Sequence, residues 1–125
     1  MTVYAERSAH LLMVTAAPAT WALHFMACYV TAAVWCAKMP TPLASLGAVR
    51  GAVAVLTAVA LAVIAAVAWW GYRAHHTGGG TPPHDADVPE DRHRFLGFAT
   101  LLLAGLSAFA VAATAIVAVF VETCQ

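Results

Sequence analysis

The residues with the greatest chemical potential lie in one apolar stretch, residues 18–38. Within it, a histidine, a cysteine, two threonines and a tryptophan recur at spacings of four, four, three and four residues: Thr20, His24, Cys28, Thr31 and Trp35. At about 100° per residue, these positions fall on one stripe of a helix. Hydrocarbon offers polar atoms no hydrogen-bond partner, so a polar stripe in a membrane helix should face protein or water. We therefore expect this stripe to pack against protein.

His24 is the residue of this stripe that could ligate haem iron or another metal. A bis-histidine haem needs a second imidazole at matching depth. The later apolar segments contain none, and His75, His76 and His93 lie at their ends. One hypothesis is a shallow haem site that pairs His24 with one of these, which would make the chain a small membrane electron carrier. The interpretation we favour assigns His24 no cofactor, and only a hydrogen bond to a neighbouring helix, a lipid headgroup or a partner subunit.

The polar segment 71–94 contains further candidate metal ligands. Histidine and carboxylate side chains suit divalent ions, and the segment offers His75, His76, His84, His93, Asp85, Asp87, Glu90 and Asp91. These residues follow no recognised ligand spacing and are spread over a glycine- and proline-rich stretch. We expect a solvated loop that contacts a partner, and no metal site.

The composition indicates that these residues are positioned by membrane-spanning helices. Hydrophobic residues make up 62% of the 125-residue chain and charged residues only 10%, against about 25% in a typical soluble domain. Three apolar segments are each long enough to cross a bilayer. The predicted fold is an all-α membrane protein with three transmembrane helices. The predicted single membrane domain, residues 1–125, has a short interfacial turn or helix at 9–16, spans at about 18–38, 47–70 and 95–121, and a polar loop at 71–94.

Prolines set the limits of the first span. Proline is tolerated in the first turn of a helix and breaks its interior, so the span is predicted to begin near Pro18 and to end at Lys38, ahead of Pro40 and Pro42. The apolar run after Met1 is too long for a typical signal peptide, so we expect this span to be retained.

Small residues at four-residue spacing mark a face of the second and third spans. Such faces let helices approach closely, which matters because lipid provides no hydrophobic drive for helix association. The alternative is that alanine is abundant and the spacing arises by chance. The predicted helix-packing positions are Gly47, Gly51, Ala54, Ala58, Ala62 and Ala66 in the second span and Ala104, Ala108 and Ala112 in the third.

Basic residues predict the orientation, because cytoplasmic flanks are enriched in lysine and arginine. One side carries Arg7, Arg73, Arg92 and Arg94, and the other carries Lys38 and Arg50. This bias predicts a cytoplasmic N-terminus and 71–94 loop and a periplasmic C-terminus.

The three cysteines show no metal-binding spacing. Cys28 and Cys36 lie within the first span, where cysteine usually acts as a small apolar residue. Cys124 is expected either to pair with another chain or to stay a free thiol in an oxidising compartment.

The sequence gives no sign of catalysis or nucleic-acid binding. No Asp, Glu or Lys lies between the span ends, which argues against a proton relay within this chain. The chain contains none of the common hydrolase, metalloprotease or nucleotide-binding motifs. Its formal net charge of zero provides no basic surface for nucleic acid. We expect no catalytic residues and no enzyme activity of its own.

Two sequence pieces resemble a known group of proteins. They are Trp21-Ala-Leu-His24-Phe25 leading to Trp35-Cys36-Ala-Lys38, and Asp91-Arg92-His93-Arg94-Phe95-Leu96-Gly97-Phe98 leading to an Ala/Leu-rich span. They resemble small three-span bacterial membrane proteins associated with haem-copper cytochrome c oxidases. The resemblance implies a non-catalytic accessory subunit in the bacterial inner membrane, surrounded by lipid and packed against larger respiratory subunits that hold the haem and copper. A transient assembly factor or a transporter subunit is a further alternative.

Overall fold

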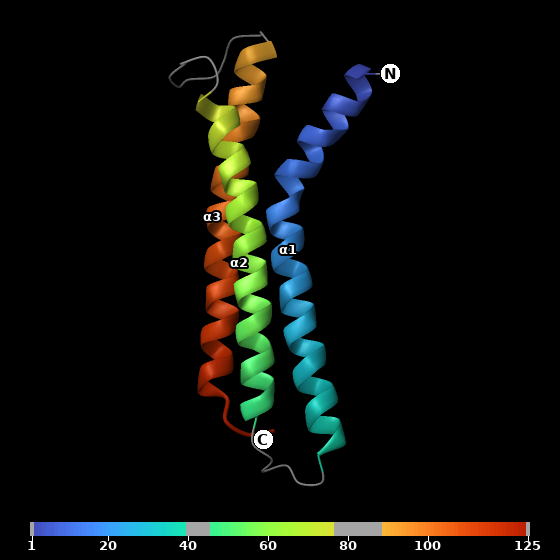
Figure 1. The fold of residues 1–125 in the computed structure, drawn as a ribbon, viewed down its shortest axis with the longest axis vertical. Helices are drawn as coiled ribbons and strands as arrows, with labels where there is room; N and C mark the ends of the chain where they lie inside the picture. The colour runs from blue at the N-terminus through green and yellow to red at the C-terminus, as the bar shows by residue number, and fades with distance from the viewer. Residues whose placement is uncertain (1, 40–45, 77–88, 125) are drawn as a thin grey trace.

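The computed structural model describes residues 2–39, 46–76 and 89–124, and these form three long helices with short flanking segments. Helix α1 comprises Thr2–Lys38, α2 comprises Gly47–His76 and α3 comprises Pro89–Phe120. The helices lie side by side along the long axis of the molecule (Figure 1). Each is long and apolar enough to cross a membrane, and the chain is therefore an all-α membrane protein with three spans.

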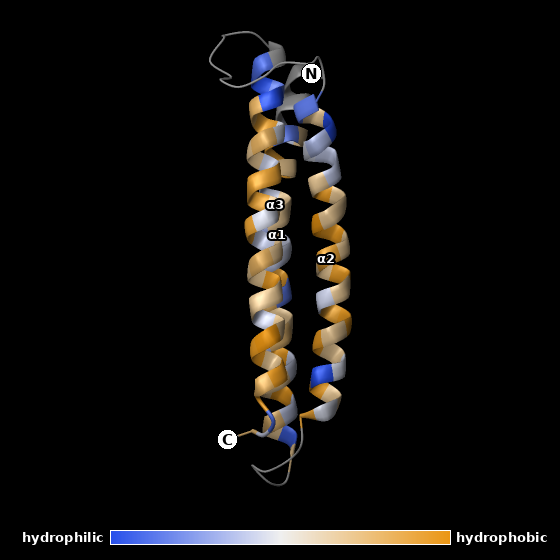
Figure 2. Cartoon of the chain, turned by 90° about the vertical axis from the view of Figure 1, so that its left-hand side faces the viewer, coloured by the Kyte–Doolittle hydropathy of each residue, from blue (hydrophilic) through white to orange (hydrophobic). Residues whose placement is uncertain are grey.

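The hydropathy of the helices changes along their length. Hydrophobic residues dominate the middle of all three helices, and hydrophilic residues gather towards the two ends of the bundle (Figure 2). Large side chains such as Leu23, Val55, Leu102 and Phe109 point outwards and are largely exposed on the isolated chain. An apolar exterior between polar ends is the arrangement that a bilayer requires.

Helix α1 does not begin at Pro18, as expected, but at Thr2, and Pro18 lies inside it. Residues 9–16 are helical and continuous with the span. Proline removes one backbone hydrogen bond and crowds the preceding turn, which bends a helix without always ending it. The N-terminal part of α1 accordingly leans away from α2 and α3 (Figure 1).

The other two helices extend into the segment predicted as a polar loop. Helix α2 continues to His76 and α3 already starts at Pro89, so the ends of the predicted 71–94 loop are helical. Gly71 of α2 lies against Gly97 of α3. A Cβ atom added to Gly97 would lie 2.7 Å from the backbone nitrogen of His75. The two glycines therefore allow backbone-to-backbone packing of α2 and α3 at this end.

Two buried clusters hold the three helices together. The first contains small and branched side chains from all three helices: Ala17, Ala60, Ile64, Val67, Ala104 and Val111. The second lies nearer the end of the bundle that holds the C-terminal tail, and contains Cys28, Leu46, Val49 and Val53. Alanine and valine at these positions allow close helix contacts, which supply van der Waals attraction in lipid.

The C-terminal tail is fixed across the end of the bundle. Cys36 near the end of α1 and Cys124 in the tail form a disulfide with a Cα–Cα distance of 5.6 Å. The backbone N–H of Leu46 donates a hydrogen bond to the carbonyl of Glu122 at 3.3 Å. The guanidinium group of Arg50 also donates to the carbonyl of Val119 in the last turn of α3, where a helix leaves carbonyl groups without partners in the helix.

Candidate functional site

The polar stripe of α1 forms a buried hydrogen-bonded cluster with α2. His24 is only 4% exposed, and its Nε2 lies 3.0 Å from Oγ1 of Thr57. The Thr57 hydroxyl donates to the carbonyl of Val53 at 2.7 Å. Because a hydroxyl has one hydrogen to donate, Thr57 must accept from His24, and this makes Nε2 the protonated nitrogen.

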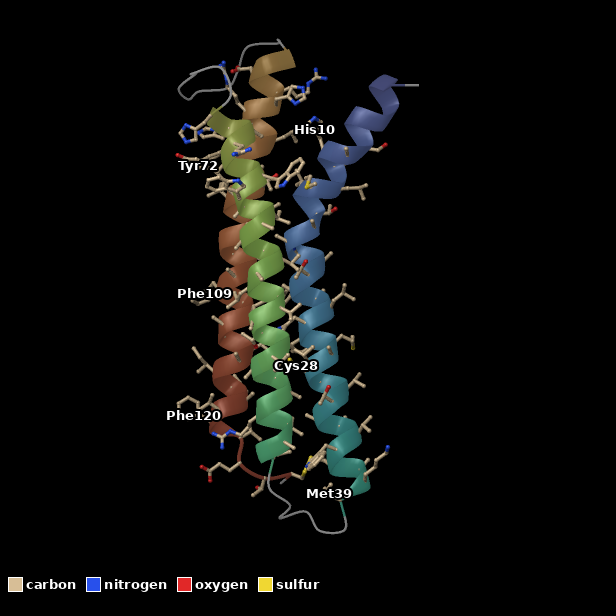
Figure 3. The ribbon with its side chains drawn as sticks, viewed as in Figure 1. His10, Cys28, Met39, Tyr72, Phe109 and Phe120 are labelled. Atoms are coloured by element: carbon tan, nitrogen blue, oxygen red, sulfur yellow. A yellow bond between two sulfur atoms is a disulfide. The ribbon has the colours of Figure 1, made fainter. Side chains whose placement is uncertain are left out.

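Cys28 completes this cluster one turn further along α1. Its Sγ lies 3.5 Å from Nε2 of His24, and Figure 3 shows Cys28 between α1 and α2. The assigned tautomer leaves Nδ1 of His24 as an acceptor, and this atom has no hydrogen-bond partner among the described residues. The thiol is buried in apolar surroundings, an environment in which cysteine is typically unreactive. The cluster thus links two helices and lacks the exposed thiolate that nucleophilic chemistry requires.

The remaining members of the stripe also face the interior in part. The hydroxyls of Thr20 and Thr31 donate to the carbonyls of Ala16 and Ala27, one turn earlier in the same helix. Trp35 packs against the second buried cluster. The hydroxyls of the stripe therefore bond within α1 and Nε2 of His24 bonds to α2, while Nε1 of Trp35, like Nδ1 of His24, is buried without a hydrogen-bond partner among the described residues.

The paired-histidine haem hypothesis does not fit this geometry. His24 contacts Thr57, whereas His75 lies 18 positions further along the same helix α2. At 1.5 Å per residue, Thr57 and His75 are about 27 Å apart along α2, and His76 is further still. Helix α3 brings His93 to the distant end as well, where its ring lies 4.5 Å from that of His10. Two axial ligands of one iron cannot span that distance.

The histidines at the far end form ring contacts with their neighbours. Nδ1 of His75 lies 3.4 Å from the carbonyl oxygen of Arg94. The His75 ring also lies near the rings of His76 and Phe98. The described part of the chain contains no group of three or more His, Cys, Asp or Glu side chains arranged to hold a metal. Of the loop candidates, His84, Asp85 and Asp87 lie outside the described residues, as does the side chain of Glu90.

The predicted small-residue faces of α2 and α3 point in different directions. In α3, Ala104 is fully buried within the chain, and Ala108 packs against the same cluster, while Ala112 is partly buried. In α2, the buried side consists instead of Val49, Val53, Ala60, Ile64, Val67 and Gly71. The predicted positions Gly47, Gly51, Ala54, Ala58, Ala62 and Ala66 are all exposed on the isolated chain.

These six exposed positions are called the α2 small face below. At about 100° per residue, they lie roughly opposite the buried side of α2. Part of this face borders a cavity of about 380 Å³ between α2 and α3, lined among others by Ala54, Ala58 and Ala118. The small face therefore lies outside the buried packing between the three helices.

The cysteine assignments require one correction. Cys28 is a free buried thiol, as expected for a small apolar residue. Cys36 is not a plain apolar residue, because it forms the disulfide with Cys124. Cys124 is accordingly neither a free thiol nor linked to another chain. The two cysteines are 88 positions apart, and no local sequence pattern reports such a pairing.

Comparison with known proteins found no matching family model, no matching curated protein and no matching solved structure.

Proposed function

We propose that this chain is a non-catalytic accessory subunit of a respiratory membrane complex, specifically a haem-copper cytochrome c oxidase. In this proposal haem and copper belong to the larger partner subunits, and the chain supplies a helical surface that packs against them. The resemblance of the 21–38 and 91–98 segments to oxidase-associated proteins supports the choice of complex. The α2 small face is the observation that carries the packing role.

The composition of that face favours a protein partner over lipid. The chain's own core uses valine, isoleucine and alanine on the opposite side of α2. Alanine and glycine on the outer side give acyl chains little side-chain surface, yet they allow another helix backbone to approach closely. Glycine at Gly51 is consistent with this use, because, apart from its own helix turn, no described residue comes within 4 Å of a Cβ atom placed there.

The disulfide supports the proposed orientation in a bacterial inner membrane. Disulfides form and persist in oxidising compartments such as the periplasm. The Cys36–Cys124 bond lies at the end of the bundle that holds Lys38 and the C-terminal tail. A disulfide at that end supports a periplasmic position for it and a cytoplasmic N-terminus, the same orientation that the distribution of basic residues favours.

The proposal is tested by purification from native membranes in mild detergent. The tagged chain should co-purify in fixed stoichiometry with subunits identified by mass spectrometry as those of a haem-copper oxidase, and the complex should show a haem absorption spectrum. Purification of the chain alone, or with subunits of another complex, would contradict it.

A pair of adjacent substitutions gives a matched control for the packing surface. Ala62→Phe places a large ring on the α2 small face, whereas Val63→Phe places the same ring at the same depth on a different side of the helix, where Val63 is also exposed. We expect Ala62→Phe to reduce retention of the oxidase at least tenfold and Val63→Phe to leave it nearly unchanged. Equal retention for both variants would remove the small face from the interface.

A further inference from the structure

The bend in α1 creates a cavity at the N-terminal end of the bundle. It has a volume of about 130 Å³ and lies between the leaning part of α1, the end of α2 and the beginning of α3. Three side chains that can ligate metals line it: His10 and Met13 from α1, and His93 from α3. The rest of the lining is apolar or small, apart from Thr100.

The two imidazoles are already close enough to share one ion. Their ring centroids are 4.5 Å apart and their planes are inclined at 63°. A metal–nitrogen bond of about 2.0 Å and a tetrahedral angle place two imidazole centroids on one metal about 5 Å apart. A small side-chain adjustment would therefore convert the edge-on ring contact into a chelating pair. Figure 3 shows His10 on the leaning part of α1, near the facing ends of the other two helices.

Met13 determines which ion this set would select. It lies three residues after His10, so both side chains leave α1 on the same face. A thioether is a soft ligand that favours Cu(I), and imidazole also binds copper well. No carboxylate is among the residues that line the cavity, which disfavours hard divalent ions such as Mg²⁺, Ca²⁺ and Mn²⁺. We propose that His10, Met13 and His93 form a binding site for Cu(I).

The arginines beside His93 disfavour a divalent cation more strongly than a monovalent one, because the repulsion grows with the charge of the ion. His93 lies between two arginines, and one of them, Arg94, is paired with Asp91 at an N–O distance of 3.8 Å. His93 is exposed and His10 is partly exposed, so an ion can reach the site from the aqueous end of the bundle. Coordination of one ion by His10 and His93 would join the leaning part of α1 to α3 more firmly than the contact between their two rings does. This inference does not depend on the identity of any partner subunit.

The test is a Cu(I) titration of the full chain in detergent micelles, without oxygen and against a chromophoric Cu(I) chelator of known affinity. A Cys28→Ser background removes the one free thiol and leaves the disulfide intact. We expect one equivalent of Cu(I) to bind. We further expect His10→Ala, His93→Ala and the volume-conserving Met13→Leu each to weaken binding at least tenfold.

Two matched controls keep the test specific. His76→Ala removes an exposed histidine at the same end of the bundle, and Met26→Leu removes an exposed methionine of the same helix α1. Neither residue lines the cavity, and both variants should bind Cu(I) as the parent does. X-ray absorption of the loaded protein should show sulfur as well as nitrogen neighbours. Absence of stoichiometric binding, equal losses in the controls, tighter binding of Zn(II), or a spectrum without sulfur would each overturn the proposal.

Discussion

Replacement of Gly97 by alanine tests the contact that sets the spacing of α2 and α3. The added methyl group would lie 2.7 Å from the backbone nitrogen of His75 and 2.8 Å from the carbonyl oxygen of Gly71. These are backbone atoms, so they cannot move aside as a flexible side chain can. Ordinary contact begins near 3.4 Å, and the two helix backbones must therefore separate by about 0.7 Å, a gap that forfeits roughly a quarter to a half of each affected dispersion contact.

The loss of stability caused by Gly97→Ala is best measured against the same substitution at a second glycine of α3. Alanine is intrinsically about 1 kcal/mol more favourable than glycine in a helix, and this gain applies to any Gly→Ala change in α3. Within the described ranges, no atom outside the same helix turn lies within 4 Å of a Cβ added to Gly105, so Gly105→Ala reports the intrinsic gain alone. Overpacking costs about 1–3 kcal/mol, and Gly97→Ala should be less stable than Gly105→Ala by that amount.

Unfolding in mixed micelles provides the assay. Increasing fractions of a denaturing detergent would be added to the purified chain, and helix separation followed by tryptophan fluorescence. A lower midpoint for Gly97→Ala than for Gly105→Ala is expected. Coincident midpoints for the two variants would refute the close approach of α2 and α3 at this end.

Two further predictions concern the links between helices. Removal of the disulfide by Cys124→Ser should lower the free energy of unfolding by about 2–4 kcal/mol and abolish the difference in gel mobility between reduced and oxidised chains, whereas an unchanged mobility difference would contradict the Cys36–Cys124 bond. A double-mutant cycle with His24→Leu and Thr57→Val should give a coupling energy of about 0.6–1.7 kcal/mol, as measured for hydrogen bonds between membrane helices. Additive effects in the same unfolding assay would mean that the 3.0 Å contact contributes no stability.

The sequence predicted the features that lipid imposes directly. Three apolar segments predicted three helices, because the backbone must satisfy its hydrogen bonds within each span. The spacing of His24 and Cys28 predicted a protein-facing stripe, and the structure places both residues in the interior. The partner of His24 could not be predicted, because the relative rotation of α1 and α2 decides that Thr57 meets it.

The features that the sequence did not predict depend on contacts between distant segments or on context. Gly71 was assigned to a loop because polar residues follow it, yet the helix continues and the glycine packs against Gly97. Pro18 lies inside α1 and does not start it, and the sequence could not distinguish these cases because proline can either end a helix or only bend it. The pairing of Cys36 and Cys124 depends on how α1 and the tail meet at one end of the bundle.

The sequence identified the small face of α2 but not what packs against it. Its alanine spacing was recognised in the sequence, but spacing alone does not distinguish a face used within the chain from one left for a partner. The structure makes that distinction, because Ala62 is exposed while Ile64, two positions later, is buried in the first cluster. Contact of this face with another protein remains a prediction.

The most direct test of the account is photo-crosslinking from this face in native membranes. A photoreactive amino acid would be placed at position 62 in one variant and at position 63 in another, and the cross-linked products identified by mass spectrometry. The probe at position 62 should cross-link to a subunit of a haem-copper oxidase, and the probe at position 63 should do so far less. Cross-links from position 62 to lipid alone, with the oxidase present in the same membrane, would contradict it.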